Sequence, residues 1–451
     1  MSDFITEYQT YCDTHGRPDR VELMLADMSG ILRGKWLPGE DEEKLAEGSV
    51  RLPQSTYAPN ILGAEVPETG LGIVIGDPDG RLYPVAGSLK PVPWQKTGSG
   101  HVAQVLVEMH DEKGELFDLS ARGKLAAMVA RFAERGWKPV VATELEFYLH
   151  LPRDEDDDAP TPPPRSPDAQ NYDLEVLERA QPVLDDILAA ARAQNLAPDT
   201  LIAEYGPGQF EINFHHTDDV MEAADAALTF RRLVRGVART HGLRATFMAK
   251  PYTDHPGNGM HAHISVVDEN GQNIFDDGSG ALSDRLKQAV AGTLATMEDM
   301  QAIFAPHMNS YRRFQAASFA PSAPDWGYDN RAAGVRLPDV SGPGARLEHR
   351  ICGADVNPHL ALTAILGGML YGLDTPDLPL PKPLDDADAT PADPLTADWL
   401  AAVDRFATSE LAADLFGLRY RDIFTAVKRD EIAQLTTEIS QVEYRTYLGR
   451  L

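Results

Sequence analysis

Apolar and polar positions alternate over short stretches in the first hundred residues, as they do in half-buried strands. Residues 21–26 (VELMLA) and 31–38 (ILRGKWLP) flank a DMSG turn and predict a β-hairpin. Residues 72–75 (GIVI) and 102–109 (VAQVLVEM) predict two further strands. The pattern therefore predicts a small, mostly β domain at the N-terminus.

The apolar spacing changes near Asp118. In residues 118–136 (DLSARGKLAAMVARFAERG), Ser120 can cap a helix with apolar residues at helical spacing, and Gly136 ends it. A strand pattern follows at residues 138–149 (KPVVATELEFYL), and helices and strands mix from there onward. We therefore predict an α+β protein with one domain over residues 1–112 and a second over residues 113–451.

Three other segments belong to this second domain. Residues 154–167 (DEDDDAPTPPPRSP) are acidic and proline-rich, which favours a solvated loop over a cation-binding strip. Residues 375–394 are similar and predict a surface excursion. The apolar run 361–373 is shorter than the ~20 residues that span a bilayer, so it predicts a buried helix.

Composition narrows the classes of partner. The 451 residues include 41 Lys and Arg against 69 Asp and Glu, for a formal net charge of −28. This charge argues against nucleic acid or an anionic membrane as a partner and favours cations. The two distant cysteines, Cys12 and Cys352, leave no disulfide framework or cysteine-type zinc site and fit a cytoplasmic location.

Four glutamates are candidates for chemistry. Glu144 and Glu146 lie two residues apart in the predicted strand, so both point to one face of it. Glu204 and Glu211 flank a GPG turn in AEYGPGQFEINF. Like charges on a half-buried face are costly unless a cation is present. The alternatives are a solvent-facing strand edge for the first pair and a hairpin with polar flanks for the second.

Two histidines extend this pattern. His261 and His263 in GNGMHAHIS also have strand spacing, and Gly257 and Gly259 would let a ligand approach the backbone. A single histidine would more often be structural. Carboxylates combined with an imidazole suit Mg²⁺ or Mn²⁺ better than a structural zinc ion.

Arginines are concentrated in NSYRRF, NRAAGVR and ARLEHRI, within residues 309–351. Their guanidinium forks bind carboxylate and phosphate oxygens, although some would form structural ion pairs with the abundant acids. Metal ions and arginines around a phosphate are the general arrangement for phosphoryl transfer. The chain has no GxxxxGK[ST] motif, so an ATP site would be of another design. The arginines are Arg312, Arg313, Arg331, Arg336, Arg346 and Arg350.

Six motifs in this order resemble the glutamine synthetase superfamily: TELEFYL, EYGPGQFEIN, FMAKPYTDHPGNGMHAHIS, NSYRRF, NRAAGVRLP and RLEHRICGADVNP. The early DMSGILRGKWLP resembles a hairpin of that family's N-terminal domain, so the likeness covers almost the whole chain. GPGQFEIN and ATFMAKPY resemble the γ-glutamylpolyamine (γ-glutamylputrescine) synthetase branch. The resemblance implies a small β-grasp domain, a catalytic α+β domain and stacked hexameric rings.

The resemblance also implies ATP as a co-substrate and two or three Mg²⁺ or Mn²⁺ ions. The metal ion beside the substrate would be held by Glu146, Glu204 and Glu211, and the one on the ATP phosphates by Glu144, His261 and Glu348. The nucleotide would contact His263, Arg336 and Arg346. Glutamate would contact Gly257, Arg313 and Arg350, and Arg331 would face the transferred phosphoryl group.

Two positions depart from true glutamine synthetases. Their flap glutamate corresponds to Phe319, and the aspartate of their ammonium pocket has no counterpart in RLPQSTY at residues 51–57. An apolar wall at Phe319 would favour an alkylamine over ammonium, and the alternative is that Phe319 is only a packing change. An alkylammonium with a pKa of about 10 must lose a proton, and Glu204 is our candidate base.

The sequence thus predicts an ATP-dependent ligase that joins the γ-carboxylate of glutamate to putrescine or another polyamine through γ-glutamyl phosphate. The alternatives are a glutamine synthetase that uses ammonium and a γ-glutamyl ligase for a monoamine. A non-catalytic structural relative is less favoured, because all six candidate metal ligands are present. We expect small-molecule substrates, no nucleic acid and no membrane.

Overall fold

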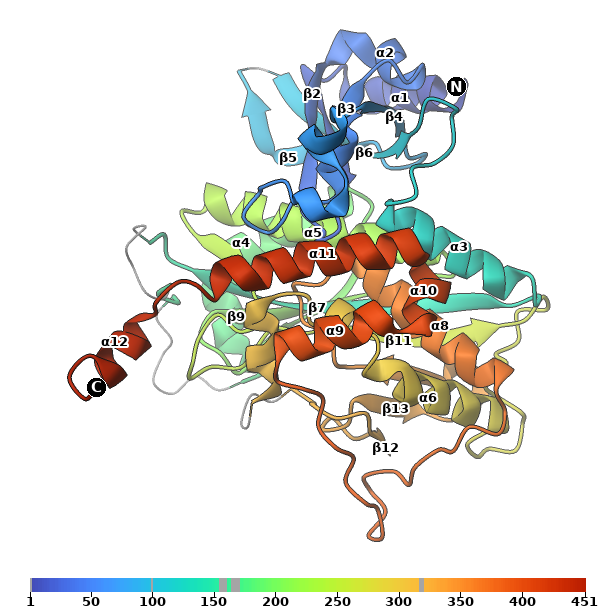
Figure 1. Cartoon of the computed structure of the whole chain (residues 1–451). Helices are drawn as coiled ribbons and strands as arrows, with labels where there is room; N and C mark the ends of the chain where they lie inside the picture. The colour runs from blue at the N-terminus through green and yellow to red at the C-terminus, as the bar shows by residue number, and fades with distance from the viewer. Residues whose placement is uncertain (1, 99, 154–159, 164–170, 316–319) are drawn as a thin grey trace.

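A small N-terminal domain sits on a larger domain in the computed structural model (Figure 1), which describes residues 2–98, 100–153, 160–163, 171–315 and 320–451. This is the predicted α+β class, with a sheet in each part. Strand β6 ends at His110 and helix α3 begins at Ala121, so the boundary lies within or near this connection. The exact boundary after residue 112 stays a prediction.

The N-terminal domain is built on a six-stranded sheet in the order β2-β1-β6-β4-β3, with β5 also paired to β6. The predicted hairpin is present, with Ala26 opposite Leu32 at its closed end. At the centre, β1 pairs in parallel with β6, while the other strand pairs are antiparallel. The strands are β1 (Arg20–Ala26), β2 (Leu32–Pro38), β3 (Arg51–Pro53), β4 (Asp79–Pro84), β5 (Lys90–Thr97) and β6 (Gly100–His110).

Two features of this domain differ from the sequence expectation. Residues 72–75 form a short 3-10 helix, η4 (Gly72–Ile75), so the predicted strand is wrong there. Gly72 and Gly76 have positive φ angles and the amide of Asp77 donates to the Gly72 carbonyl, which closes a turn instead. In addition, helices α1 (Ser2–His15) and α2 (Glu42–Ala46) flank the sheet.

The larger domain contains an eight-stranded sheet in the order β12-β13-β14-β11-β7-β9-β8, with β10 also paired to β7, among the described residues. The long β7 is the strand predicted at residues 138–149. The strands are β7 (Lys138–His150), β8 (Pro198–Ala203), β9 (Gln209–Phe214), β10 (Arg244–Thr246), β11 (Met260–Val267), β12 (Trp326–Tyr328), β13 (Val335–Asp339) and β14 (Arg346–His349).

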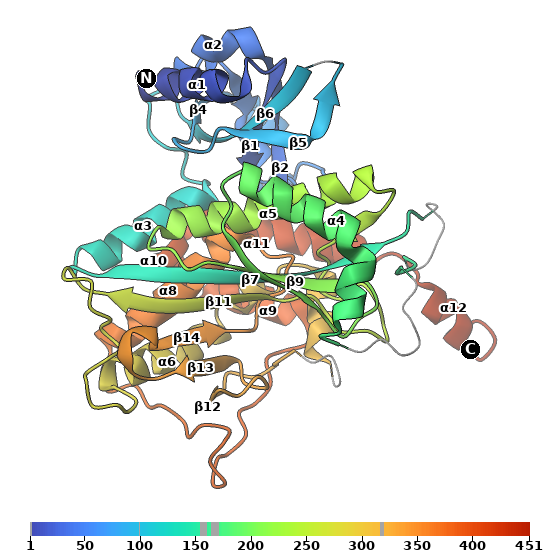
Figure 2. The same ribbon diagram turned by 180° about the vertical axis from the view of Figure 1, so that it is seen from behind.

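Helices cover this sheet, and α4 and α5 run between it and the N-terminal domain (Figure 2). Ser120 caps α3 as predicted, accepting a 2.9 Å hydrogen bond from the amide of Gly123. The apolar run 361–373 lies in the buried α8, also as predicted. The helices are α3 (Ala121–Ala133), α4 (Leu174–Ala193), α5 (Val220–Thr240), α6 (Asp284–Met297), α7 (Gln301–Phe304), α8 (Pro358–Asp374), α9 (Trp399–Thr408), α10 (Glu410–Phe416), α11 (Leu418–Leu435) and α12 (Gln441–Tyr447).

The sequence predicts two surface segments, and the structure describes only one of them in full. Residues 375–394 contain no helix or strand and follow the surface, as expected. The predicted loop at residues 154–167 falls mostly outside the described residues. Across the part of the chain that the structure describes, no helix combines the length and the apolar character needed to span a membrane.

A buried ion pair joins the two domains. Lys428 and Glu431 on α11 are fully buried, with 2.9 Å between Nζ and Oε2. Lys428 also lies 3.3 Å from the hydroxyl of Ser29, and Glu431 accepts the amide of Ile61 at 2.8 Å. Both N-terminal partners sit in turns of the small domain, so this pair contributes contacts between the two domains.

Candidate active site

The alternation of strand β7 presents two carboxylates on one face of the sheet. Leu145 and Phe147 are fully buried in the core, whereas the intervening Glu144 and Glu146 point to the opposite, half-buried face. This is the arrangement predicted from their two-residue spacing. The carboxylates therefore lie on a half-buried face inside the sheet rather than on a solvent-facing strand edge.

Strand register brings further polar residues onto this face. Glu144 lies opposite His261 on β11, and Glu146 lies opposite Glu211 on β9. One step further across the sheet, His263 pairs with Glu348 on β14, and Glu348 pairs with Arg336 on β13. Segments far apart in the sequence thus converge through strand pairing alone.

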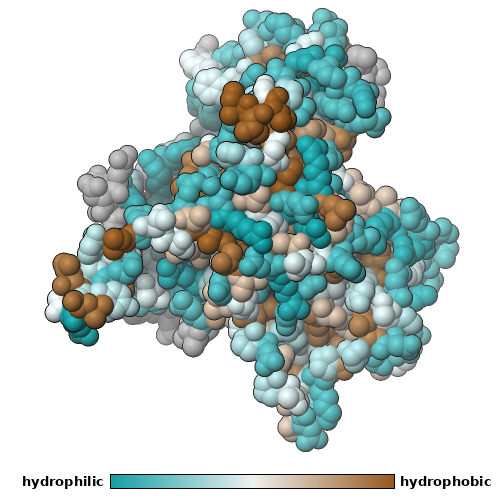
Figure 3. All heavy atoms as spheres, viewed as in Figure 1, coloured by the Kyte–Doolittle hydropathy of each residue, from teal (hydrophilic) through white to brown (hydrophobic). Residues whose placement is uncertain are grey.

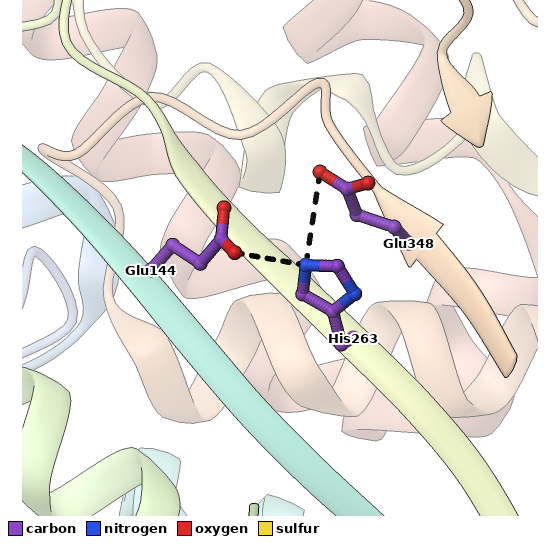
Figure 4. A group of neighbouring side chains, drawn as sticks. All are labelled: Glu144, His263 and Glu348. Atoms are coloured by element: carbon purple, nitrogen blue, oxygen red, sulfur yellow. Dashed lines mark hydrogen bonds and ion pairs between the residues drawn. The ribbon is translucent and has the colours of Figure 1, made fainter. Parts of the chain in front are cut away.

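Two groups of side chains could each hold a metal ion. In one group, Glu144, His263 and Glu348 offer ligand atoms that all lie within 4.8 Å of one another (Figure 4). The second group combines Glu144 with Glu211 and His261. The Nε2 atom of His263 lies 3.0 Å from Glu144, and the Nδ1 atom of His261 lies 3.1 Å from the same carboxylate.

The grouping differs in detail from the ligand sets implied by the resemblance. Glu348 groups with His263, although its Oε1 also lies 3.8 Å from the Nδ1 atom of His261. Glu211 groups with His261, and neither described group includes Glu146 or Glu204. The two implied sets of three ligands therefore stay predictions.

Crowding of carboxylates perturbs their pKa values. Burial and the nearby Glu146 raise the pKa of Glu204 to about 7. Burial raises the pKa of Glu211 well above its ordinary value, and Glu144, Glu146 and Glu204 add to this effect. Such a cluster holds protons or cations, because several buried anions repel one another. The oxygen-rich donor set fits a hard divalent cation such as Mg²⁺ or Mn²⁺.

Glu144 and Glu348 are held in their charged forms. Burial opposes ionisation of Glu144, but hydrogen bonds from His261 and His263 outweigh it and lower its pKa. Burial also opposes ionisation of Glu348, and Arg350 together with the two histidines lowers its pKa. These two carboxylates could therefore bind a metal ion without first losing a proton.

Arginines line the side of the site next to Glu348. Arg336 donates to Glu348 at 2.8 Å and Arg350 forms an ion pair with its other oxygen. The Nε atom of Arg346 lies 3.3 Å from Nδ1 of His263. Arg336 also pairs with Asp329, at 2.9 Å from its Nε atom. Some of these arginines thus form structural ion pairs, the alternative that the sequence had left open.

The glycine-rich loop before β11 forms another wall. The amide of Gly259 donates to Glu146 at 2.6 Å, and Gln209 donates to the carbonyl of Gly257 at 3.0 Å. A Cβ atom added at Gly257 would lie 2.9 Å from Cγ of Arg313, so the loop and this buried arginine are in close contact. Arg313 donates to the carbonyl of Ile351 at 2.8 Å.

Two of the arginines singled out in the sequence lie at the surface. Arg331 is exposed, yet it lies close enough to Glu204 to affect its pKa. Arg312 is exposed and contrasts with the buried Arg313 beside it. Phe319, which carried the argument for an alkylamine, lies outside the described residues.

The sequence reasoning missed an aromatic pair beside Glu204. Tyr172 and Tyr205 are half-exposed, with ring centroids 6.4 Å apart in an edge-to-face arrangement. Glu204 and Arg331 both influence the pKa of Tyr172. Tyr205 could have been found because it follows Glu204 directly, whereas Tyr172 lies some thirty residues earlier and has no motif around it.

Comparison with known proteins identifies the architecture. Residues 118–447 match the catalytic domain of glutamine synthetase. The chain belongs to the glutamine synthetase family. Its likeness to γ-glutamylputrescine synthetase of Escherichia coli (strain K12) is 38% identity, over 98% of this chain and 94% of the relative. Glutamate–isopropylamine ligase of a Pseudomonas species is 32% identical, over 95% of each chain.

A solved structure supports the same assignment for this glutamine synthetase family member. The complex named GmaS/ADP superposes with a TM-score of 0.85 at 27% identity and covers 100% of both chains. Members of the family use ATP and divalent metal ions. The predicted superfamily and α+β fold are thereby confirmed.

Proposed function

We propose that this protein is an ATP-dependent ligase that joins the γ-carboxylate of glutamate to a primary amine, with putrescine as the acceptor. The supporting observation is the sheet face on which Glu144, Glu211, His261, His263 and Glu348 converge beside arginines. The relative named γ-glutamylputrescine synthetase aligns over nearly the whole of both chains, so this face lies within the aligned length.

The chemistry requires two steps. A carboxylate is a poor acylating group because its leaving group would be oxide. In the first step an oxygen of the γ-carboxylate bonds to the terminal phosphorus of ATP and ADP leaves. In the second step the amine nitrogen bonds to the γ-carbonyl carbon, phosphate leaves with the electron pair of the C–O bond, and a proton leaves the nitrogen.

The acidic face would hold the metal ions. We assign Glu146, Glu204 and Glu211 to the ion beside the substrate, and Glu144, His261 and Glu348 to the ion on the ATP phosphates. Bound Mg²⁺ or Mn²⁺ supplies positive charge that stabilises the phosphoryl group. The raised pKa values of Glu204 and Glu211 support this assignment, because they show buried carboxylates that repel one another, and a bound cation would relieve that repulsion.

The basic side would hold the anionic substrates. We assign Arg313 and Arg350 to the carboxylate of glutamate, with Gly257 beside them. His263, Arg336 and Arg346 would contact the nucleotide, and Arg331 would face the transferred phosphoryl group. Arg313 and Arg350 are both buried, so their guanidinium groups are held in place before glutamate arrives.

The amine would enter beside Glu204. We propose Glu204 as the general base that takes a proton from the attacking ammonium group. The exposed rings of Tyr172 and Tyr205 would bind the alkylammonium through their faces, a contact that is worth about 0.5–2 kcal/mol. This aromatic pair would form one wall for the amine, and the apolar wall expected at Phe319 stays a prediction.

Assembly and location complete the proposal. We propose self-association into stacked hexameric rings in the cytoplasm. Helix α12 projects from the body in both ribbon views, and Figure 3 shows apolar residues at its tip. Val442, Tyr444 and Tyr447 are exposed on it, and the exposed Leu448 follows it directly. An exposed apolar projection of this kind supports contact with another copy of the chain.

Isotope transfer tests the two-step chemistry directly. Glutamate labelled with ¹⁸O in its γ-carboxylate is incubated with ATP, Mg²⁺ and putrescine, and the products are analysed by mass spectrometry. We expect one ¹⁸O atom in each phosphate released and a product with the mass of γ-glutamylputrescine. Unlabelled phosphate alongside that product would exclude an acyl phosphate, and absence of the product would exclude putrescine as the acceptor.

A further inference from the structure

A cavity of about 590 Å³ lies between the N-terminal domain and helix α5, apart from the candidate active site. The turn 29–32 and Ile61 contribute the N-terminal wall, and α5 contributes much of the other. Figures 1 and 2 both show α5 directly beneath the N-terminal domain. None of the residues assigned above to metal, ATP or glutamate lines this cavity.

Positive charge is concentrated in this cavity, although the chain as a whole has a net charge of −28. Arg231, Arg235 and Arg239 recur at every fourth residue and so share one face of α5. Arg232 lines the cavity beside them. Four guanidinium groups from a single helix therefore meet in one concave space.

Arg231 forms the buried floor of the cavity and is only 6% exposed. Its Nη1 atom donates to the carbonyls of Ala354 at 3.2 Å and Val356 at 2.8 Å. Its Nη2 atom has no hydrogen-bond partner among the described residues. This atom points toward the turn, since a Cβ added at Gly30 would lie 3.0 Å from it. A buried donor without an acceptor is costly.

The other arginines are unevenly neutralised. Arg232 forms an ion pair with Glu22 and donates to Gln104 at 2.9 Å. Arg235 and Arg239 form no ion pair within the described ranges, and both are accessible from solvent. Desolvation by neighbouring protein atoms and repulsion from Arg239 lower the pKa of Arg235. Burial and repulsion from Arg235 lower the pKa of Arg231 to about 9.

Other titratable groups do not cancel this charge. His307 lines the cavity, and burial together with Lys428 and Arg231 lowers its pKa well below its ordinary value. Asp355 is the one carboxylate among the lining residues, and burial raises its pKa. A hydroxyl from Ser310 donates to its Oδ2 atom at 2.7 Å. The cavity thus retains positive charge from Arg231, Arg235 and Arg239.

We propose that this cavity is an effector site for a small anion with two or more carboxylate or phosphate groups. Guanidinium forks pair with the oxygens of such groups, and Arg235 and Arg239 present accessible guanidinium groups to the cavity. The volume matches pockets for small molecules. The acidity of the whole chain disfavours a nucleic acid in the same place.

The walls of the cavity connect to the glutamate side of the active site. Asn309 exchanges hydrogen bonds of 2.8 and 2.9 Å with the backbone of Lys250. Met248 accepts a 2.9 Å hydrogen bond from Asn258, which adjoins Gly257. Asn309 also lies in the 3-10 segment η5 (Met308–Phe314), which carries Arg313. Anion binding is therefore expected to change the affinity for glutamate, and the coupling is reciprocal.

Calorimetric titration of the full-length protein tests the site without relying on catalysis. Succinate, tricarballylate and inorganic phosphate are titrated separately in the absence of divalent metal ions and ATP, with and without saturating glutamate. The three probes separate carboxylate from phosphate recognition. Arg235→Gln and Arg239→Gln are compared with Arg192→Gln, because Arg192 and Arg239 occupy the last turns of adjacent helices.

We expect one saturable site per chain for at least one probe, also in the presence of glutamate. Its affinity should fall at least tenfold in Arg235→Gln and Arg239→Gln and stay unchanged in Arg192→Gln. The saturating probe should change the affinity for glutamate at least twofold in the wild type. The proposal is overturned if no probe binds, if glutamate displaces the probe competitively, or if both cavity variants bind normally. Sedimentation velocity compares the oligomeric state of Arg239→Gln with that of the wild type. If no probe binds and the variant assembles differently, the proposal is overturned and this face is instead an interface between copies of the chain. Probe binding that leaves the glutamate affinity unchanged would overturn the effector role.

Discussion

Glu348 offers the sharpest test of the metal assignment, because it is a fully buried carboxylate between two arginines. Glu348→Gln keeps the shape of the side chain but removes its charge. Arg336 would retain its contact with Asp329, whereas Arg350 has no other carboxylate partner within the described ranges. The substitution therefore leaves one buried guanidinium group without a counter-charge.

The size of the effect follows from these contacts. Two unit charges about 4 Å apart attract by about 4 kcal/mol at an effective dielectric constant of about 20. Removal of one partner from a buried ion pair costs about 3–5 kcal/mol, because the remaining charge stays desolvated. We therefore expect the free energy of unfolding to fall by about 3–5 kcal/mol. Loss of a ligand that places charge at the phosphoryl group should lower kcat by at least about 100-fold.

Three assays measure these quantities. Urea unfolding gives the change in stability, electron paramagnetic resonance of free Mn²⁺ counts the bound ions, and coupled ADP release gives kcat. We expect one fewer tightly bound Mn²⁺ per chain in Glu348→Gln. Glu298→Gln is the matched control, because Glu298 pairs with Arg405 at the surface and should leave all three quantities unchanged. Wild-type Mn²⁺ binding and kcat in Glu348→Gln would refute the assignment of this residue.

Three further predictions follow from the site and the domain contact. Tyr205→Leu should raise the KM for putrescine about tenfold through loss of a cation–π contact, and leave the KM for ATP unchanged. Steady-state kinetics test this against Tyr371→Leu, a substitution at another exposed tyrosine, on α8, and equal KM values in the two variants would contradict it. Lys428→Met should lower the free energy of unfolding by about 3–5 kcal/mol in urea titrations, because it leaves Glu431 charged and buried. The double variant with Glu431→Gln should recover much of that loss, and a purely additive result would show that the two buried charges do not stabilise each other. The folded pKa of Glu204 is about 7, above its ordinary value of 4.5, so the folded state binds the proton more tightly. Metal-free protein should therefore lose up to about 3 kcal/mol of stability as the pH rises from 4.5 to 7. Urea unfolding at pH 5 and pH 7.5 should show a smaller difference in Glu204→Gln than in the wild type, and an equal difference would contradict the shift.

The side chains that share one face of the candidate site were predictable because strand geometry is local. A two-residue spacing places Glu144 and Glu146 on one face whatever the rest of the fold does, and the same holds for His261 and His263. Which of these residues meet was not predictable, since register between β7, β9 and β11 depends on long-range pairing. That register places Glu211 opposite Glu146 and His261 opposite Glu144.

The errors in the fold have equally specific causes. The run GIVI at residues 72–75 is too short for periodicity to distinguish a strand from a turn. The positive φ angles of Gly72 and Gly76 allow the turn that forms there instead. The arginine spacing on α5 is visible in the sequence, but the turn of the N-terminal domain that faces it is not. Tyr172 was missed because its place beside Glu204 comes from tertiary packing.

The choice of amine is the central claim, and a comparison of kcat/KM across amines tests it most directly. ADP release with glutamate and ATP is measured for putrescine, isopropylamine, ethanolamine and ammonium at one pH. We predict the highest kcat/KM for putrescine, with ammonium at least about tenfold lower, because the proposed amine wall of Tyr172 and Tyr205 would bind an alkylammonium better than a small hydrated ion. A kcat/KM for ammonium equal to or above that for putrescine would contradict the account.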